Sequence, residues 1–231
     1  MTIRFDKRLF IILSLAFIIA TIIGTLSHEF GHYIVAKGLG YKASIHYGYV
    51  DYGEDFYDSI NKITYQYRKQ IEKGESFPGK DQYDRFIRES LWMSMGGPLQ
   101  TLLTGTIGLI LLFVWKRRFK AREKLNGRQW MLIFITLFWL RQTANMLVAL
   151  GTFIPNRHFS YSDEVGIARN LGLPSWLLLI TTGVIGIIIL YIVIFKFIPK
   201  QQRKTFVLSG MMGAVAGYIL WLYLLGPVLL P

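Results

Sequence analysis

Long apolar stretches alternate with polar segments along this chain, and the apolar stretches are long enough to cross a lipid bilayer. An α-helix rises about 1.5 Å per residue, so roughly 20 apolar residues cross the hydrocarbon core. Stretches of this kind occupy residues 9–36, 91–115, 130–154, 175–197 and 206–229. The pattern predicts an all-α polytopic membrane protein, folded as a single membrane domain with about five transmembrane helices.

Residues 41–90 form the one sizeable polar segment, and we predict that they are an extramembrane insert between the first two helices. Within it, the aromatic-rich residues 45–50 predict a short strand or one arm of a hairpin. Residues 55–72 predict an amphipathic helix, because apolar residues recur there at helical spacing. These are Phe56, Ile60, Ile63, Tyr67 and Ile71. This apolar stripe could lie on the bilayer, cover a neighbouring site as a lid, or pack on the protein's own outer face.

Two pairs of glycines lie in the last two predicted helices, Gly183 with Gly186 and Gly213 with Gly217. Small residues about one turn apart let helix backbones approach closely. We therefore interpret the last two helices as a scaffold packed within the fold. Homodimerisation through the same glycines is the alternative, so the oligomeric state stays open.

Basic residues gather at the ends of the apolar stretches and give the chain a formal net charge of +12. They do not form a basic surface with interleaved aromatic residues, so we expect a lipid bilayer and no nucleic acid as partner. The N-terminus, residues 116–128 and residues 196–204 hold only Asp6 and Glu123 as acids, whereas the opposite segments carry as many acids as bases. The positive-inside rule then predicts a cytoplasmic N-terminus and an outer C-terminus, with a bacterial cytoplasmic membrane as the expected setting.

A cleaved signal peptide is the alternative interpretation of the first stretch, because a basic start precedes an apolar run. The run from Leu9 to Leu26 has no charged residue and continues directly into a polar motif. Cleavage near residues 25–27 would leave that motif at a new N-terminus, which argues against a signal peptide.

Cysteine is absent, and the histidines are His28, His32, His46 and His158. The chain therefore forms no disulfide and offers no thiolate ligand, so any metal must be bound by His, Asp or Glu. Four histidines are also too few for the membrane di-iron hydroxylases and desaturases, a class that needs about eight.

The polar motif is His28-Glu29-Phe30-Gly31-His32, an HExxH sequence inside the first predicted membrane helix. Two imidazoles one helical turn apart suit a tetrahedral zinc ion, Zn2+. The glutamate between them can accept a proton from an attacking water and later donate it to a leaving amine. Because such residues are costly at membrane depth, we predict His28 and His32 as metal ligands and Glu29 as the catalytic residue.

A catalytic zinc site needs a third protein ligand besides an open position. The motif is expected near the outer end of the first helix, so the third ligand should come from an outer segment. The candidates are the acids of residues 41–90, His46, His158, Asp163 and Glu164. Asp163 precedes a predicted short helix at residues 164–171 and could instead be its N-cap.

Two further features are expected at the same membrane depth as the HExxH motif. Gly96-Gly97-Pro98 should interrupt the second helix, and backbone exposed there could bind an extended peptide substrate, although a simple kink is the alternative. Arg141 and Asn145 are one turn apart in the third helix and share a face. Asn145 could hydrogen-bond a substrate or a developing oxyanion, and the alternative is that these polar residues form an interhelical clamp.

Taken together, HExxH in the first helix, Gly96-Gly97-Pro98-Leu99 in the second, and Asn145 followed by Pro155 and Asp163 resemble the site-2 protease family of intramembrane zinc metalloproteases. The resemblance covers roughly residues 20–175, the three-helix catalytic core. It implies that Asp163 is the third zinc ligand and that Asn145 lies near the substrate. Asn145 and Asp163 are further apart than in the family, and Glu164 replaces the glycine that follows the aspartate. Glu164 and His158 therefore remain alternative metal ligands.

The predicted function is hydrolysis of peptide bonds in or near transmembrane segments of other membrane proteins, with zinc as cofactor. The family resemblance implies regulated intramembrane proteolysis. The alternative is a non-proteolytic membrane protein of the same fold, an adaptor or transporter-like component that binds zinc or a client helix. A metalloprotease acting outside the bilayer and merely anchored by helices conflicts with the depth of the motif.

Overall fold

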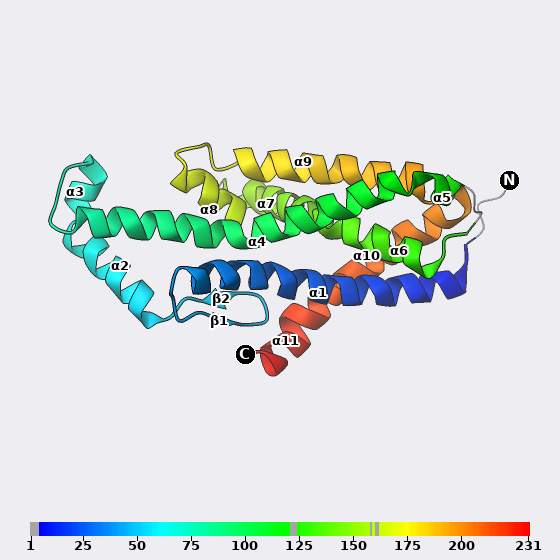
Figure 1. The fold of residues 1–231 in the computed structure, drawn as a ribbon, viewed down its shortest axis with the longest axis horizontal. Helices are drawn as coiled ribbons and strands as arrows, with labels where there is room; N and C mark the ends of the chain where they lie inside the picture. The colour runs from blue at the N-terminus through cyan, green and yellow to red at the C-terminus, as the bar shows by residue number, and fades with distance from the viewer. Residues whose placement is uncertain (1–4, 121–123, 158, 160–161) are drawn as a thin grey trace.

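The computed structural model describes residues 5–120, 124–157, 159 and 162–231, and it shows an elongated helical bundle (Figure 1). Within these ranges, five helical segments are long and apolar enough to cross a membrane. They are Lys7–Gly38, Lys80–Val114, Gly127–Pro155, Leu177–Phe197 and Lys200–Leu229. The five predicted stretches each fall largely within one of these segments, so the expectation of an all-helical protein with helices able to span a bilayer is confirmed.

The first and second segments are the single helices α1 (Lys7–Gly38) and α4 (Lys80–Val114). Each of the other three segments contains a short stretch of 3-10 or π-helix. The third comprises α6 (Gly127–Thr136), the 3-10 turn η1 (Leu137–Trp139) and α7 (Leu140–Asn156). The fourth comprises α9 (Leu177–Ile192) and the π-helical turn η2 (Val193–Phe197). The fifth comprises α10 (Lys200–Ile219), the π-helical turn η3 (Leu220–Leu225) and α11 (Gly226–Leu229). Short helices α5 (Lys116–Lys120) and α8 (Asp163–Asn170) lie between segments.

The bounds of α1 follow from its sequence. The side chain of Asp6 caps its N-terminus by accepting a hydrogen bond of 3.0 Å from the Leu9 amide. The helix ends at Gly38, and Gly40 follows with a φ of 92°, which a residue with a side chain rarely adopts. The helix therefore ends two residues beyond the predicted stretch 9–36.

Residues 80–90 of the predicted insert are helical and form the first turns of α4. The first part of the insert is a hairpin of β1 (Ser44–Ile45) and β2 (Val50–Asp51), which pair antiparallel with Ser44 opposite Asp51. The predicted amphipathic helix is present but is broken at Tyr67 into α2 (Glu54–Gln66) and α3 (Arg68–Lys73). These two helices and the start of α4 project beyond the rest of the bundle (Figure 1).

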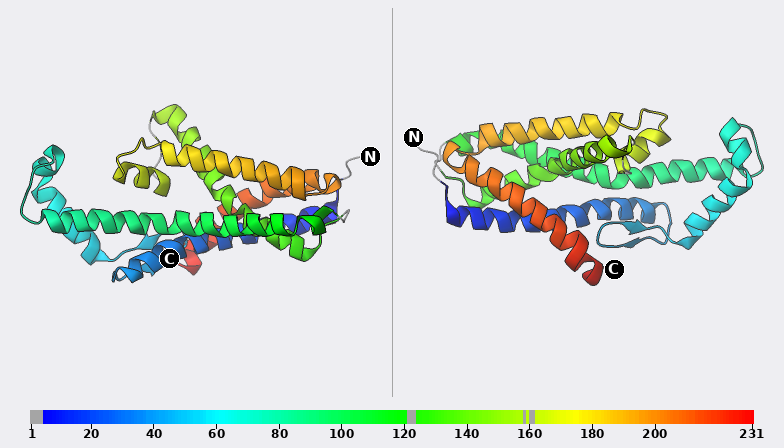
Figure 2. Two further views of the ribbon diagram at one scale, coloured as in Figure 1. Left: turned by 45° about the horizontal axis from the view of Figure 1, so that its top comes forward. Right: turned by 180° about the vertical axis from the view of Figure 1, so that it is seen from behind.

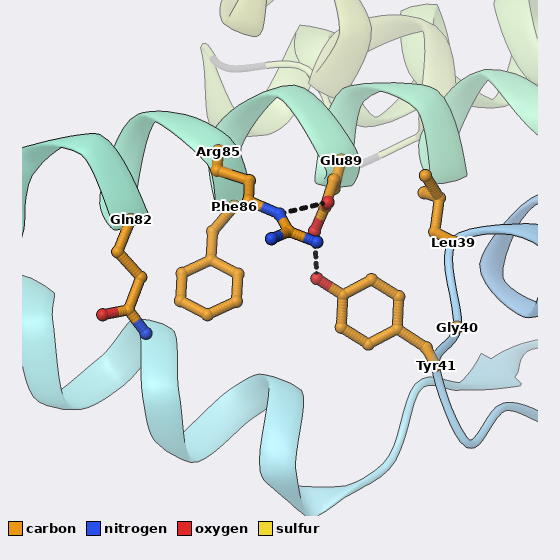
Figure 3. Close-up of a pocket in the computed structure, with 7 residues that line it drawn as sticks. All are labelled: Leu39, Gly40, Tyr41, Gln82, Arg85, Phe86 and Glu89. Carbon is orange, nitrogen blue, oxygen red and sulfur yellow. Dashed lines mark hydrogen bonds and ion pairs between the residues drawn. The ribbon is translucent and has the colours of Figure 1, made fainter.

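Tyr41 fastens the chain leaving α1 to the projecting part of α4 (Figure 3). Its hydroxyl donates to the Glu89 carboxylate, which also accepts from Arg85 Nε at 2.7 Å. Burial and the negative charge of Glu89 raise the pKa of Tyr41 above its ordinary value, so the phenol stays a donor. Beside this contact is a cavity of about 290 Å³, which Gln82 and Phe86 also line.

Pro98 lies inside α4, and α4 is continuous from residue 80 to residue 114. The prediction that Gly96-Gly97-Pro98 interrupts this helix is therefore wrong. A proline inside a membrane helix removes only one backbone hydrogen bond, which close packing can offset. Here α1 packs directly against this point: a Cβ at Gly31 would collide with the carbonyl oxygen of Gly96.

The scaffold glycines are used for packing within the chain. Gly213 of α10 faces the backbone of Ser14, and Gly217 faces that of Ile18, so α10 crosses closely over α1 (Figure 2, right). Gly183 and Gly186 of α9 meet Met146 and Thr143 of α7 in the same way. This confirms the prediction of close packing within the fold.

The two ends of the bundle differ in charge and in the helices and strands that lie there. The start of α1, α5 and the junction of α9 with α10 lie at one end, whereas α2, α3, α8 and the hairpin lie towards the other (Figure 1). The three basic segments of the sequence thus gather at a single end, as the alternation of spans predicts.

Candidate metal centre

The HExxH motif lies on the face of α1 that packs against α4. At about 100° per residue, His28 and His32 differ by about 40° around the helix, and Glu29 lies about 60° beyond His32. All three side chains turn inward, with exposures of 0% for His28, 4% for His32 and 5% for Glu29. Such burial of three titratable groups in an apolar helix is costly unless they bind something.

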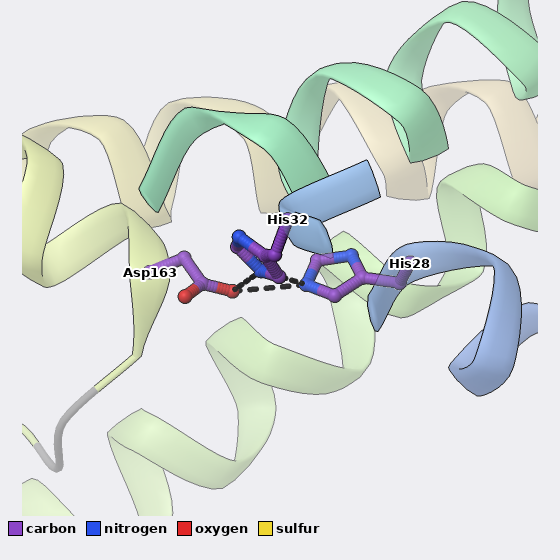
Figure 4. Close-up of side chains that lie close together, drawn as sticks. All are labelled: His28, His32 and Asp163. Carbon is purple, nitrogen blue, oxygen red and sulfur yellow. Dashed lines mark hydrogen bonds and ion pairs between the residues drawn. The ribbon is translucent and has the colours of Figure 1, made fainter. Parts of the chain in front are cut away.

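Asp163 is distant from the two histidines in the sequence, but its carboxylate points at their imidazole rings (Figure 4). One carboxylate oxygen, Oδ2, lies 2.9 Å from His28 Nε2 and 3.4 Å from His32 Nε2. The two Nε2 atoms are 3.2 Å apart. Three potential ligand atoms from three residues therefore converge on one point.

The other nitrogen of each ring has its own partner. His32 Nδ1 donates to the carbonyl oxygen of Met93 at 2.6 Å. His28 Nδ1 lies 2.9 Å from the hydroxyl of Thr101, and that hydroxyl donates in turn to Gln100 Oε1 at 3.4 Å. These contacts suit the tautomer with the proton on Nδ1, which would leave a lone pair on Nε2 of each ring for a metal.

Met93, Gly97 and Thr101 are successive residues one turn apart on α4, and together they form the wall behind the imidazoles. A Cβ at Gly97 would lie 2.5 Å from His28 Nε2 and closer still to His32 Nε2, so only glycine fits. Met93 and Thr101 were not predicted from the sequence, although their spacing of four from Gly97 places them on its face. Gly96 packs against the backbone of α1 and Gly97 against the two imidazoles, and the role of Gly96-Gly97-Pro98 in substrate binding stays a prediction.

Helix α8 fixes the position of Asp163. Its N-cap is Ser162, whose side chain accepts a hydrogen bond from the Val165 amide, so the alternative that Asp163 is the N-cap is wrong. Asp163 is the first residue of the helix and its side chain is free to point at the histidines. Burial opposes ionisation of Asp163, but the two imidazoles outweigh it and hold the pKa of this carboxyl below its usual range.

The other candidate ligands lie elsewhere. Glu164 is 2% exposed and its two carboxylate oxygens each lie 3.4 Å from Asn145 Nδ2, so Asn145 contacts a neighbour of Asp163. His46 is on the hairpin, where it stacks on Tyr49. His158 lies outside the described residues. In the described part of the chain, the three-ligand group is His28, His32 and Asp163.

The donor set fits a zinc ion. Tetrahedral ligands about 2.1 Å from zinc lie roughly 3.4 Å from one another, close to the three separations here. With both Nδ1 atoms protonated, the converging atoms are all acceptors, which repel each other unless a cation lies between them. Arg141 forms an ion pair with Glu29 and not with Asp163 among the described residues, so a bound cation would be the counterion of the Asp163 carboxylate.

Arg141 reaches Glu29 from α7. Its Nη2 atom lies 3.7 Å from Glu29 Oε1, so the arginine expected to need a partner at membrane depth has one. Asn145 is one turn further along α7 and faces Glu164. The two residues thus contact carboxylates on two other helices, α1 and α8, which agrees with the alternative of an interhelical polar clamp.

Comparison of the chain with protein-family models, with curated proteins and with solved structures found no match.

Proposed function

We propose that this protein is an intramembrane zinc metalloprotease, resembling the site-2 proteases, that hydrolyses peptide bonds in or near transmembrane segments of other membrane proteins. The observation that carries the proposal is the convergence of His28 Nε2, His32 Nε2 and Asp163 Oδ2 within 3.4 Å, beside the buried carboxylate of Glu29. Both the ligand set and the glutamate are required for hydrolysis of this class.

In this proposal His28, His32 and Asp163 hold the metal, and Thr101 and the Met93 carbonyl keep the two rings oriented. Bound zinc would polarise the scissile carbonyl and make water a better nucleophile. Glu29 accepts the proton of the attacking water and donates it to the departing nitrogen. The wall formed by α4 excludes bulk water from the rear of the site, which strengthens these charge interactions.

The depth of the site supports a membrane-embedded substrate. His28 lies 21 residues after Lys7, which corresponds to roughly 30 Å along α1, about the thickness of the hydrocarbon core. The catalytic residues would then lie near the boundary of the bilayer opposite the basic end. A transmembrane segment that unwinds near its own end could present a peptide bond there.

The test is the zinc content of detergent-purified protein, measured by elemental analysis for wild type, Asp163→Ala and Glu29→Gln. We expect about one zinc per chain in wild type and Glu29→Gln, and loss of zinc in Asp163→Ala. In parallel, a single-helix membrane protein carrying a tag at each end serves as reporter. Wild type should cleave it and Glu29→Gln should not.

Other outcomes would change the proposal. Zinc retained in Asp163→Ala would move the third ligand to Glu164 or His158. A wild type that binds zinc but cleaves nothing, and whose cellular role survives Glu29→Gln, would favour the non-proteolytic adaptor. A wild type that never retains zinc would contradict the proposal outright.

We also propose that the basic end of the bundle faces the cytoplasm, so that the site opens towards the outer side. Because the chain has no cysteine, single cysteines report orientation without background. Tyr65→Cys in the insert should react with a membrane-impermeant maleimide in right-side-out membranes. Lys124→Cys should react only after lysis, and the reverse pattern would place the site on the cytoplasmic side.

A further inference from the structure

Arg141 has donors that its ion pair with Glu29 does not use. The distance of 3.7 Å between Nη2 and Glu29 Oε1 is too long for a hydrogen bond, so the contact is electrostatic. Among the described residues, none accepts a hydrogen bond from its buried Nε atom. A guanidinium has five N–H donors, and leaving a buried one unpaired is unfavourable unless a ligand completes it.

The guanidinium of Arg141 also lies next to the carboxylate that would act on the attacking water. The carboxylate of Glu29 must lie within hydrogen-bond reach of the attacking water, and the water must lie next to the scissile carbonyl. A cation beside that carboxylate is therefore close to the reacting atoms. The Arg141 side chain is 29% exposed, so it is open on one side instead of sealed in the bundle.

We propose that Arg141 is a catalytic residue, whose guanidinium donates hydrogen bonds to the oxygen of the scissile carbonyl as negative charge develops on it. This assignment rests on the proposed protease function. Interactions that strengthen in the transition state accelerate the reaction, and a donor fixed in a water-poor site is effective because it needs little reorganisation.

The step is a hydrolysis. The water oxygen bonds to the carbonyl carbon, one electron pair of the C=O bond moves to its oxygen, and Glu29 takes the water proton. Arg141 stabilises that oxygen without giving up a proton. The C=O bond then reforms, the C–N bond breaks, and Glu29 returns the proton to the nitrogen.

The test compares two peptide isosteres that cannot be cleaved. A phosphinic peptide presents tetrahedral, negatively charged oxygens, as in the transition state, and a ketomethylene peptide presents an ordinary carbonyl. Their affinities for zinc-loaded protein are measured by calorimetry in detergent. Arg141→Gln should bind the phosphinic peptide about 100-fold more weakly and the ketomethylene peptide unchanged, with zinc content unaltered. Arg141→Lys should recover part of the loss, because a charge remains.

Two controls distinguish a catalytic role of Arg141 from a structural one. Arg85→Gln breaks another arginine–glutamate pair, 2.7 Å long and away from the metal centre, and should change neither affinity. The Glu29→Gln background removes the charge that Arg141 pairs with. If Arg141 binds the substrate oxygen, the 100-fold loss persists in this background. If Arg141 is only a counterion of Glu29, the loss disappears and the proposal is overturned.

The remaining outcomes are equally decisive. Equal weakening of both isosteres, or loss of zinc in both Arg141→Gln and Arg141→Lys, would give Arg141 a structural role and overturn the assignment. A wild type that cleaves its reporter while Arg141→Gln binds the phosphinic peptide normally would overturn the assignment alone. A zinc-loaded wild type that neither cleaves the reporter nor binds either isostere would overturn the protease function itself.

Discussion

Gly97 of α4 lies directly against His28 of α1, and a Cβ at residue 97 would be 2.5 Å from the Nε2 atom of that histidine. The absence of a side chain at this position therefore sets how closely α4 approaches the face of α1 that carries the two histidines. Helix α4 and the candidate ligands of α1 are thus held at one fixed separation. A metal centre needs this kind of preorganisation.

Gly97→Ala should abolish zinc binding because its methyl group would displace both imidazoles. Gly24→Ala, in α1, is the matched control, since nothing lies within 4 Å of a Cβ there. Elemental analysis of the two purified variants is the measurement. Full zinc content in Gly97→Ala would show that the centre tolerates a shift of α4.

Thr101→Val should weaken zinc binding by about 10- to 100-fold, because His28 Nδ1 loses the hydroxyl that orients its ring. Thr106→Val is the control: Thr106 lies on the same helix but accepts from Trp139 Nε1 instead. Competition with a fluorescent zinc chelator measures both affinities. Equal affinities in the two variants would remove Thr101 from the centre.

Zinc removal should lower the thermal stability of the protein. A ligand that binds only the folded state at 1,000 times its Kd adds about 4 kcal/mol to the free energy of unfolding. We expect Tm in detergent to fall when a chelator is added to wild type, and to recover with zinc. Asp163→Ala should melt at the same temperature with and without chelator, and a chelator effect in that variant would point to another metal site.

Tyr41→Phe should loosen the hairpin without affecting zinc. The variant loses the hydrogen bond to Glu89, a contact worth about 1 kcal/mol, or a roughly fivefold faster local opening. Hydrogen exchange of residues 41–56, followed by mass spectrometry, reports it. Tyr65→Phe should exchange as wild type, since Tyr65 is 91% exposed. Unchanged protection in Tyr41→Phe would mean that other contacts hold the insert.

The helices of this fold and two of the candidate ligands were predictable because local rules determine them. The length of an apolar run indicates a span, and spacing of four places His28 and His32 on one face. These features depend on residues close together in the sequence.

The features that were wrong or missed depend on contacts between distant segments. The continuity of α4 through Pro98 is favoured by the contact of Gly96 with Gly31, which no local pattern contains. The choice of Asp163 over Glu164 depends on how the Ser162 cap orients α8 against α1 and α4. Thr101 looks like an ordinary membrane-helix threonine until His28 is placed beside it.

The separation of the ligands along the chain has a consequence for biosynthesis. His28 and Asp163 are 135 residues apart, so at about 5–20 residues per second the ribosome makes the aspartate roughly ten seconds after the histidines. During that interval the growing chain carries the motif in the membrane but not a complete ligand set. We expect a nascent chain to be unable to attack neighbouring proteins at the site of insertion, because the proposed hydrolysis needs a ligand that is made only after the third span.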